Sequence, residues 1–329
     1  MTVLVTGGAG YIGSHMVHAL IDAGERVVVL DNLSTGFAWA VAHGATLVVA
    51  ESGDQPRLAA LIAEHAVDAV IHFAASIVVP DSVRHPLAYY RNNTINSRAL
   101  IETAVESGVR HFIFSSTAAV YGNPERVPVR EEDPTVPLSP YGRSKLMTEL
   151  MLQDAGSAHG LRYAILRYFN VAGADPRGRA GQSTAGATHL IKVAVETALG
   201  LRPKISVFGT DYPTPDGTCI RDYIHVWDLV RAHADALAYL RAGGASVTLN
   251  CGYGRGFSVL EVIETVKRVC GVDFAVELAD RRPGDPAQIV AAADRARAML
   301  KWHPQFDDLA TIVGHALAWE RKLQASARP

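Results

Sequence analysis

The first half of the chain alternates short, continuous apolar runs with amphipathic segments of helix length. Apolar runs without alternation are typical of parallel strands that are covered on both faces. Alternation of such strands with helices predicts an α/β fold built on a doubly wound parallel sheet. The apolar runs are Val3–Val5, Arg26–Leu30, Thr46–Val49, Ala69–Phe73, Phe112–Phe114 and Ala164–Leu166.

After residue 170 the pattern changes to Gly- and Pro-rich loops that separate apolar helices. Loops are expected at Asp175–Gly186, Tyr212–Gly217 and Arg281–Pro286, and a helix at Ser258–Val269. We therefore expect a first domain at residues 1–170 and a second, smaller α/β domain at residues 171–329. Residues 222–240 could rejoin the first sheet, which leaves this boundary open.

Composition narrows the possible functions. A chain of 329 residues, 49% of them apolar, can bury a large core without disulfides or structural metal. The net charge of −2 offers no basic field to nucleic acid, and the longest apolar stretch, residues 66–80, is too short for a membrane span. We therefore expect no nucleic acid and no membrane as partners.

The cysteines and histidines bear on metal and location. Neither residue type has metal-site spacing, so no metal is expected. The three cysteines are dispersed, which favours a cytoplasmic location.

A glycine-rich segment joins the first predicted strand to the first predicted helix. Gly7, Gly10 and Gly13 allow a tight turn and let backbone N–H groups approach a pyrophosphate at the helix N-terminus. Asp31 ends the second predicted strand, at the distance expected for a carboxylate that binds an adenosine ribose. Because this carboxylate would repel a 2′-phosphate, the pattern predicts NAD rather than NADP as cofactor.

Tyr141 and Lys145 lie four positions apart, so on a helix they share one face. A free phenol has a pKa of about 10, and a nearby ammonium favours its ionised form. Tyr141 is therefore a candidate proton acceptor and Lys145 its electrostatic partner. A hydroxyl at Ser115, Ser116 or Thr117 could bind the substrate hydroxyl, and the pleat of the strand decides which one does.

Seven segments carry a more specific signal: VTGGAGYIGSH at 5–15, LDNLSTG at 30–36, FIFSSTAAVYG at 112–122, SPYGRSKLMTE at 139–149, LRYFNVAGA at 166–174, FGTDYPTPDGTCIRDYIHV at 208–226 and RRPGD at 281–285. In these segments, and over essentially its whole length, the chain resembles the UDP-glucose 4-epimerases, a family of extended short-chain dehydrogenases/reductases. The resemblance implies a Rossmann domain, bound NAD, a UDP-sugar substrate and a homodimer.

The resemblance also implies roles for individual residues. Thr117, Tyr141 and Lys145 would be catalytic. NAD would be lined by Gly7, Gly10, Tyr11, Ile12, Gly13, Asp31, Asn32, Leu33, Ser34, Thr35, Gly36, Asp54, Gln55, Phe73, Ala74, Ala75, Ser76, Ile77, Asn92, Tyr141, Lys145 and Phe169. The substrate would be held by Thr117, Tyr141, Asn170, His189, Leu190, Ser206, Val207, Phe208, Arg221, Arg282, Asp285 and Ile289.

Two arginines also make chemical sense without the resemblance. Arg221 and Arg282 each carry a guanidinium fork that can pair with diphosphate oxygens.

Three positions depart from the pattern of other members of the family. Ile77 stands where some carry a Lys on the cofactor phosphates, His189 stands where others have Asn, and Ile289 occupies a sugar-pocket position of variable size.

The expected reaction is interconversion of UDP-glucose and UDP-galactose through transient oxidation at C4, a 4-keto intermediate and hydride return. An epimerase for UDP-N-acetylglucosamine, UDP-xylose or UDP-arabinose is an alternative. A nucleotide-sugar 4,6-dehydratase would need an acid and a base where this chain has Ala118 and Ala119. A non-catalytic NAD-binding sensor is the alternative of another class, and it would not need both Tyr141 and Lys145.

Overall fold

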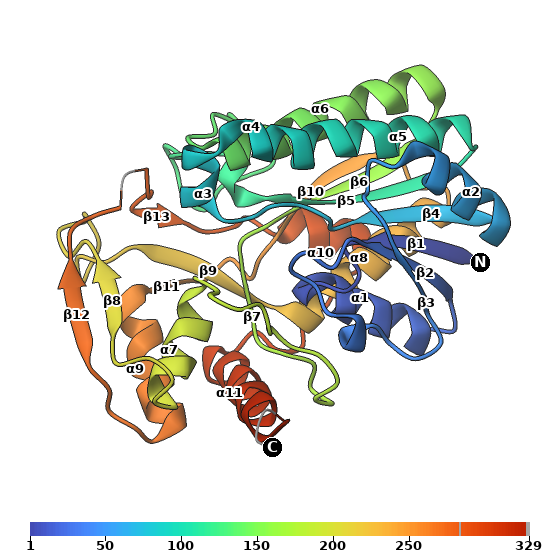
Figure 1. Cartoon of the computed structure of the whole chain (residues 1–329). Coiled ribbons are helices and arrows are strands. Elements are labelled where there is room, and N and C mark those ends of the chain that lie inside the picture. The colour runs from blue at the N-terminus through green and yellow to red at the C-terminus, as the bar shows by residue number, and fades with distance from the viewer. Residues whose placement is uncertain (283, 327–329) are drawn as a thin grey trace.

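The computed structural model describes residues 1–282 and 284–326. Seven parallel strands form its central sheet, and the spatial order reverses between β1 and β4, as in doubly wound folds (Figure 1). The predicted α/β fold is confirmed. In spatial order the strands are β10 (Val247–Cys251), β6 (Arg162–Tyr168), β5 (His111–Thr117), β4 (Val67–His72), β1 (Thr2–Thr6), β2 (Arg26–Asp31) and β3 (Thr46–Val49).

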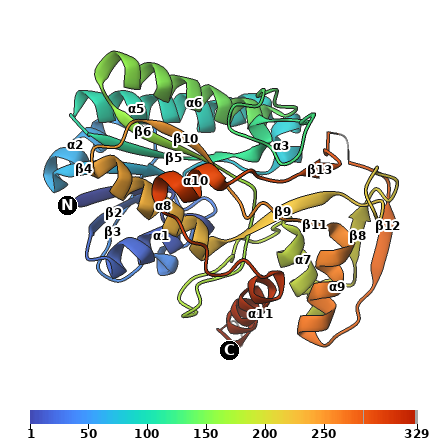
Figure 2. The same cartoon turned by 180° about the vertical axis from the view of Figure 1, so that it is seen from behind.

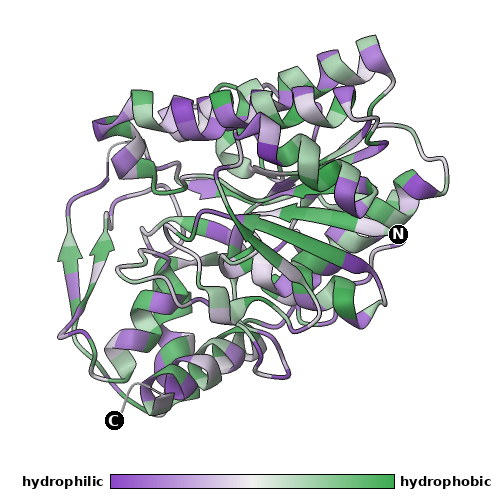
Figure 3. Ribbon diagram, turned by 45° about the vertical axis from the view of Figure 1, so that its right-hand side comes forward, coloured by the Kyte–Doolittle hydropathy of each residue, from purple (hydrophilic) through white to green (hydrophobic). Residues whose placement is uncertain are grey.

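Helices cover both faces of this sheet (Figure 2). Alternate β1 side chains point to opposite faces of the sheet. Leu4 packs in one apolar cluster, and Val3 and Val5 pack in the other. The strands are accordingly the most apolar part of the ribbon (Figure 3). One face carries α2 (Gln55–His65), α3 (Val79–Arg84), α4 (Pro86–Tyr89), the π-helical turn η2 (Tyr90–Ile95), α5 (Asn96–Glu106) and α6 (Pro140–His159), and the other carries α1 (Tyr11–Asp22), α8 (Val226–Arg241) and α10 (Asp294–Leu300).

The chain returns to the first sheet after its excursion into the second region. Helix α8 packs against α1 and against strands β5 and β6, and β10 pairs with β6 at the sheet edge. Residues 226–251 therefore cover and extend the sheet that the first 170 residues begin. The sequence left residues 222–240 open and gave no prediction for β10.

The second region is smaller and carries two further sheets. Strand β9 (Ile220–His225) lies at its centre, with β7 (Asn170–Ala172), β11 (Gly256–Ser258) and β13 (Gln288–Ile289) paired to it. Strands β8 (Ile205–Phe208) and β12 (Val276–Ala279) form a separate parallel pair. Helices α7 (Leu190–Ala198), α9 (Val259–Cys270) and α11 (Leu309–Ser326) pack together beside them. One continuous apolar core joins this region to the first sheet.

Candidate functional site

The glycine loop between β1 and α1 forms a cradle at the carboxyl edge of the sheet. Gly7 has a φ of +72°, and a Cβ there would lie 2.6 Å from the backbone nitrogen of Ala74. A Cβ on Gly13 would lie 2.1 Å from the carbonyl oxygen of Gly7. No side chain caps the N-terminus of α1 at Gly10, so its first backbone N–H groups are available to an anion. The loop therefore fits a dinucleotide pyrophosphate.

Asp31 is held at the end of β2, beside this cradle. Its carboxylate accepts hydrogen bonds from the backbone N–H of Ala9 at 2.9 Å and of Leu33 at 2.8 Å. Each carboxylate oxygen retains a further lone pair for a ribose hydroxyl. Residues 32–36 run over the glycine loop, since a Cβ on Gly36 would lie 2.8 Å from the carbonyl carbon of Ala9. The structure thus brings the glycine loop and the predicted ribose acid together.

The segments that follow β3 and β4 border the same edge of the sheet. Asp54 caps α2 by accepting from the Arg57 N–H at 3.1 Å, and Gln55 donates to Glu102 at 2.8 Å. Residues 73–75 follow β4 directly, and Ala74 packs under Gly7. The carboxyl ends of β1, β2 and β4 therefore supply most of the predicted cofactor residues.

A buried asparagine, missed by the sequence analysis, links the cofactor edge to the catalytic helix. The Asn93 side chain accepts from the Ser76 N–H at 2.8 Å and donates to the Ser76 carbonyl at 2.9 Å and the Ser144 hydroxyl at 3.0 Å. Asn92 donates to the Ser76 hydroxyl at 2.9 Å, whereas Ile77 is 48% exposed and supplies no charge. Both asparagines lie in η2, and π-helical turns are frequent at functional sites.

Tyr141, Lys145 and Thr117 meet where β5 ends. Tyr141 and Lys145 share one face of α6 and are 7% and 2% exposed. The Lys145 ammonium donates to the Ser115 carbonyl at 2.9 Å and lies 4.8 Å from the centre of the Phe114 ring. The Thr117 hydroxyl lies close enough to the Tyr141 phenol to lower its pKa.

The contacts of the three hydroxyls at the end of β5 distinguish them from one another. Ser115 donates to the Tyr168 hydroxyl at 2.9 Å, and Ser116 donates to the Glu149 carboxylate. Thr117 is therefore the hydroxyl placed beside Tyr141.

Burial governs the electrostatics of this cluster. It raises the pKa of the Tyr141 phenol above the ordinary value, and the neighbouring Thr117 hydroxyl opposes this shift. Burial also lowers the pKa of Lys145 to about 7, while the Glu149 carboxylate acts in the opposite direction. Lys145 can therefore gain or lose a proton near neutral pH. A phenolate beside an ammonium is favoured by their mutual attraction, so the pair can accept and return the proton of a substrate hydroxyl.

A buried ion pair lies behind the catalytic cluster. Arg167 of β6 pairs with Glu149 of α6 through two nitrogens. Its Nε lies 3.0 and 3.2 Å from the two carboxylate oxygens, and its Nη2 lies 2.6 Å from one of them. Arg167 also donates to the Tyr121 hydroxyl at 3.0 Å. The sequence analysis missed this pair, although Glu149 follows Lys145 at the same four-residue spacing that links Lys145 to Tyr141.

The catalytic edge leads directly into the second region. Phe169 follows β6 and is 7% exposed, and Asn170 begins β7, where it lies opposite Tyr223 of β9. Arg221 lies two residues earlier on β9. The Tyr11 hydroxyl donates to the Gly173 carbonyl at 2.7 Å, which ties the cofactor helix to the same crossing.

The predicted diphosphate residues lie at β9 and beside β8. The Nη2 atom of Arg221 lies 3.7 Å from a carboxylate oxygen of Asp285, and Arg221 is the register partner of Ile289 on β13. The Arg282 guanidinium lies 3.7 Å from the centre of the Phe208 ring. Both guanidinium groups therefore lie next to other predicted substrate residues.

The structure limits what β8 contributes. Ser206 donates to Glu277 at 3.3 Å across the β8–β12 pair. Val207 is 1% exposed and its side chain packs in the core, which leaves only its backbone for a ligand.

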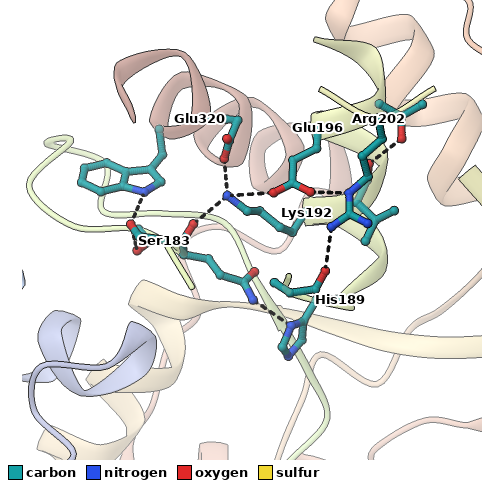
Figure 4. A network of polar contacts seen from close by, with 12 residues as sticks. Ser183, His189, Lys192, Glu196, Arg202 and Glu320 are labelled. Carbon is teal, nitrogen blue, oxygen red and sulfur yellow. Dashed lines mark hydrogen bonds and ion pairs between the residues drawn. The ribbon is translucent and has the colours of Figure 1, made fainter. Parts of the chain in front are cut away.

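His189 and Leu190 lie at the start of α7. The Gln182 side-chain amide lies 2.7 Å from Nδ1 of His189, and burial lowers the pKa of this imidazole, which keeps it neutral (Figure 4). A small cavity adjoins Asn170, His189 and Leu190. These three predicted nucleotide residues therefore come together, although 20 positions separate Asn170 from Leu190 in the sequence.

The fold and these residues define a class of protein: a Rossmann-type oxidoreductase-like enzyme with a Tyr-Lys proton-transfer pair. The family model for the NAD dependent epimerase/dehydratase family matches residues 3–252, and the chain belongs to this family. Its cofactor is NAD, as predicted. The fit of the glycine loop to a pyrophosphate and the carboxylate of Asp31 agree with this cofactor.

Several characterised proteins are similar along nearly their full length. The UDP-glucose 4-epimerase of Azospirillum brasilense is 60% identical over 324 residues, covering 98% of this chain and 93% of the relative. The crystal structure of UDP-glucose 4-epimerase from Brucella ovis in complex with NAD superposes with a TM-score of 0.93 at 44% identity, covering 96% and 97% of the two chains. The Stenotrophomonas maltophila enzyme, with bound NAD and formylated UDP-arabinopyranose, has a TM-score of 0.96 at 42% identity, covering 99% and 100%. The sequence resemblance is confirmed.

Two other features bear on the class of site. Within residues 1–282 and 284–326, no three His, Cys, Asp or Glu side chains are grouped so that they could hold a metal ion. Of the helices that the structure describes, none has both the length and the apolar character needed to cross a membrane.

Proposed function

We propose that this enzyme interconverts UDP-glucose and UDP-galactose by transient oxidation at C4. The observation that carries the proposal is the meeting of Tyr141, Lys145 and Thr117 beside the NAD cradle. Phe169 and Asn170 lead from β6 into β7, and β7 pairs with β9, the strand that carries Arg221. High identity to UDP-glucose 4-epimerases over the full chain supports the same substrate.

The chain's own residues supply the proton transfer and the binding. Thr117 orients the sugar 4-hydroxyl, and Tyr141 takes its proton while Lys145 stabilises the phenolate. Bound NAD, held by the glycine loop and Asp31, would supply the hydride acceptor for the sugar C4 and the hydride donor for the 4-keto sugar. Between the two hydride transfers, the 4-keto sugar must rotate within the site so that its other face meets the cofactor. Arg221 and Arg282 can hold the diphosphate throughout, because guanidinium pairs with phosphate oxygens in a bidentate manner.

The experiment is turnover of UDP-galactose by wild-type enzyme and by Tyr141→Phe, with the product identified. Loss of a general acid–base group costs about 10²-fold or more in kcat, while the phenyl ring preserves packing and NAD content. Wild-type enzyme that leaves UDP-galactose unchanged would contradict the proposed reaction. Near-normal turnover by Tyr141→Phe would contradict the assigned base alone.

One local feature disfavours the dehydratase alternative. Ala118 and Ala119 lie in the short 3-10 turn η3 (Ala118–Val120) directly after Thr117. Neither side chain can transfer the protons that elimination of water from C5 and C6 requires.

We infer two functional units in the chain. Residues 1–170 would hold NAD and residues 171–329 would hold the nucleotide sugar, with α8 (Val226–Arg241) returning to the first unit while residues 222–225 stay in β9 of the second. The packing of α8 against α1 supports that return.

We propose that two copies form a homodimer through the outer helical layer. Helices α3, α4 and α6 and the turn η2 pack together there, and they expose Val83, Leu87, Ile95, Met147 and Leu150 by 42–80%. An apolar surface on adjoining helices suits an identical helical surface of a second copy. Light scattering should give twice the chain mass, and Leu87→Asp with Met147→Asp should give the single mass. A wild-type protein that is monomeric at micromolar concentration would rule this out.

A cytoplasmic location is also proposed. Cys219, Cys251 and Cys270 are all free thiols, which suits a reducing compartment. Cell fractionation with an antibody against the chain tests this location.

A further inference from the structure

A buried lysine joins three separate parts of the second region. The Lys192 ammonium, on α7, donates to the Gln182 carbonyl at 3.0 Å and lies 3.4 Å from a carboxylate oxygen of Glu196. It also pairs with Glu320 of the C-terminal helix α11 (Figure 4). The Lys192 and Glu320 side chains are 8% and 7% exposed. This ion pair therefore fixes α11 to α7 and to the segment that precedes α7.

The charges of this cluster balance. Glu196 also accepts from the Arg202 guanidinium at 2.5 Å, and Arg202 donates to the Ala187 carbonyl at 3.2 Å. Lys192 and Arg202 thus face Glu196 and Glu320, two cations against two carboxylates. Buried ion pairs of this kind contribute little to stability compared with apolar packing, so a positioning role is a better reason for them.

This cluster holds residues 181–189 in place. Lys192 binds the Gln182 carbonyl and Arg202 binds the Ala187 carbonyl. The Gln182 side chain in turn contacts Nδ1 of His189. The segment thus has a cation at each end, and it leads into the predicted nucleotide residues His189 and Leu190.

Helix α11 holds the same segment by a second contact. The Trp319 indole N–H donates to the Ser183 hydroxyl at 3.1 Å, and a Cβ on Gly181 would lie 2.2 Å from the Trp319 ring. On its other side, Trp319 stacks with Trp39 at 6.2 Å between ring centres. Trp39 belongs to the turn η1 (Ala38–Ala40), three residues after the predicted cofactor residue Gly36. Helix α11 therefore touches segments adjoining both binding regions.

A small cavity connects the cluster to the binding residues. Its walls include Asn170, His189 and Leu190 together with Lys192 and Glu320, and it encloses about 20 Å³. A displacement of the Lys192–Glu320 pair would therefore change the cavity wall next to the predicted nucleotide residues.

We propose that Lys192, held by Glu320 of α11, is a positioning residue for the nucleotide part of the substrate: it fixes residues 181–189 so that His189 and Leu190 meet the nucleotide. The inference rests on the proposed function, since it takes a UDP-sugar as the ligand. Lys192 itself acts through Gln182 and does not contact the reacting atoms. A positioning role of this kind affects substrate affinity and leaves the proton and hydride transfers at Tyr141 unchanged.

The test compares Lys192→Met/Glu320→Gln with wild type. The double variant removes one cation and one carboxylate together, so Glu196 and Arg202 still balance and the fold is retained. We expect KM for UDP-galactose and Kd for UDP, measured by calorimetry, to rise about tenfold while kcat changes less than about threefold. NAD content and melting temperature should stay close to wild type. Unchanged KM and Kd in the folded double variant would overturn the proposal.

Two further variants complete the test. Glu320→Gln alone leaves Lys192 bound to Gln182 and Glu196, so its Kd for UDP should rise less, by about threefold. If the double variant does not fold, an unchanged Kd for UDP in Glu320→Gln overturns the proposal. Lys322→Met is the matched control, because Lys322 also reaches from α11 to a loop carbonyl, that of Gly178, at 2.7 Å. Its Kd should equal that of wild type.

These measurements separate the positioning role from the function. Wild-type enzyme that binds UDP but does not convert UDP-galactose would refute the proposed reaction. Wild-type turnover with equal UDP affinity in the double variant would refute the role of Lys192 alone.

Discussion

Tyr141 and Lys145 are both almost fully buried, so neither holds a charge without a partner close by. Burial lowers the pKa of Lys145 to about 7 and raises that of Tyr141. The two shifts move the pKa values of the amine and the phenol apart, because desolvation favours the neutral form of both groups. At the scale of single residues, the phenolate that the proton transfer needs therefore depends on a positive charge close to Tyr141, which Lys145 supplies when it is protonated.

Asp31 should set the choice of cofactor. Its carboxylate lies beside the cradle, where a 2′-phosphate would meet a like charge in a partly desolvated site. Mass spectrometry of cofactor released from purified enzyme should find NAD(H) and little NADP(H). Asp31→Asn, which removes the charge at nearly constant size, should retain more NADP than wild type does. Mainly NADP(H) in the wild-type enzyme would refute this role.

Ile289 should control the size of the sugar that is accepted. It is 6% exposed and lies beside Arg221 in the β9–β13 register. We expect UDP-galactose to be preferred over UDP-N-acetylgalactosamine, with measurable turnover of both, because a pocket rejects one small extra group by only about 1–3 kcal/mol. Relative kcat/KM for the two substrates should move towards UDP-galactose in Ile289→Tyr and towards the N-acetylated sugar in Ile289→Ser. A constant ratio in all three enzymes would show that another residue is the gate.

At the scale of elements, α6 combines catalysis and support on one face. Tyr141, Lys145 and Glu149 follow one another at four-residue spacing, and all three are buried. Glu149 anchors the helix to β6 through Arg167 and to β5 through Ser116. The helix is thereby fixed against the two strands whose carboxyl ends form the site.

Breaking the Glu149–Arg167 pair should be costly. Glu149→Gln leaves a buried guanidinium without its counter-charge, which destabilises proteins by about 3–5 kcal/mol. Urea unfolding at pH 7 should show this loss. Glu264→Gln is the control, because Glu264 is exposed and pairs with Lys267 on the surface of α9, where such changes cost less than about 1 kcal/mol. Similar losses for both variants would contradict the importance of the buried pair.

At the scale of the whole molecule, the core contains several neutral histidines. Burial lowers the pKa of His15 and of His233 to about 4, and that of His72 to about 3. In the unfolded chain these imidazoles titrate at about 6.5. The unfolded state therefore binds protons first as pH falls, so folding stability should decrease from about pH 6.5 down to about pH 4.

A variant tests this dependence. His233→Leu removes one of the titrating groups, so its melting temperature should fall less between pH 7 and pH 5 than that of wild type. His303→Leu, at an exposed position, should retain the wild-type slope. Equal slopes for wild type and His233→Leu would show that His233 does not contribute to acid destabilisation.

The sequence by itself determined six of the seven strands of the first sheet, β1 to β6, together with the cofactor loop and the Tyr141–Lys145 pair. These features depend on local rules: apolar runs make buried strands, Gly7 requires a positive φ, and a four-residue spacing places two side chains on one helix face. The glycine loop and Asp31 also predicted NAD, and the motif resemblance added the family; both are confirmed.

Only the tertiary structure decided which polar groups meet. It placed Thr117 rather than Ser115 or Ser116 beside Tyr141, and it revealed Asn93 in a π-helical turn that no local pattern signals. It also paired Lys192 with Glu320 across 128 positions of sequence. Such contacts arise because packing the apolar core brings distant segments together, and a buried charge must then find its partner wherever the fold places one.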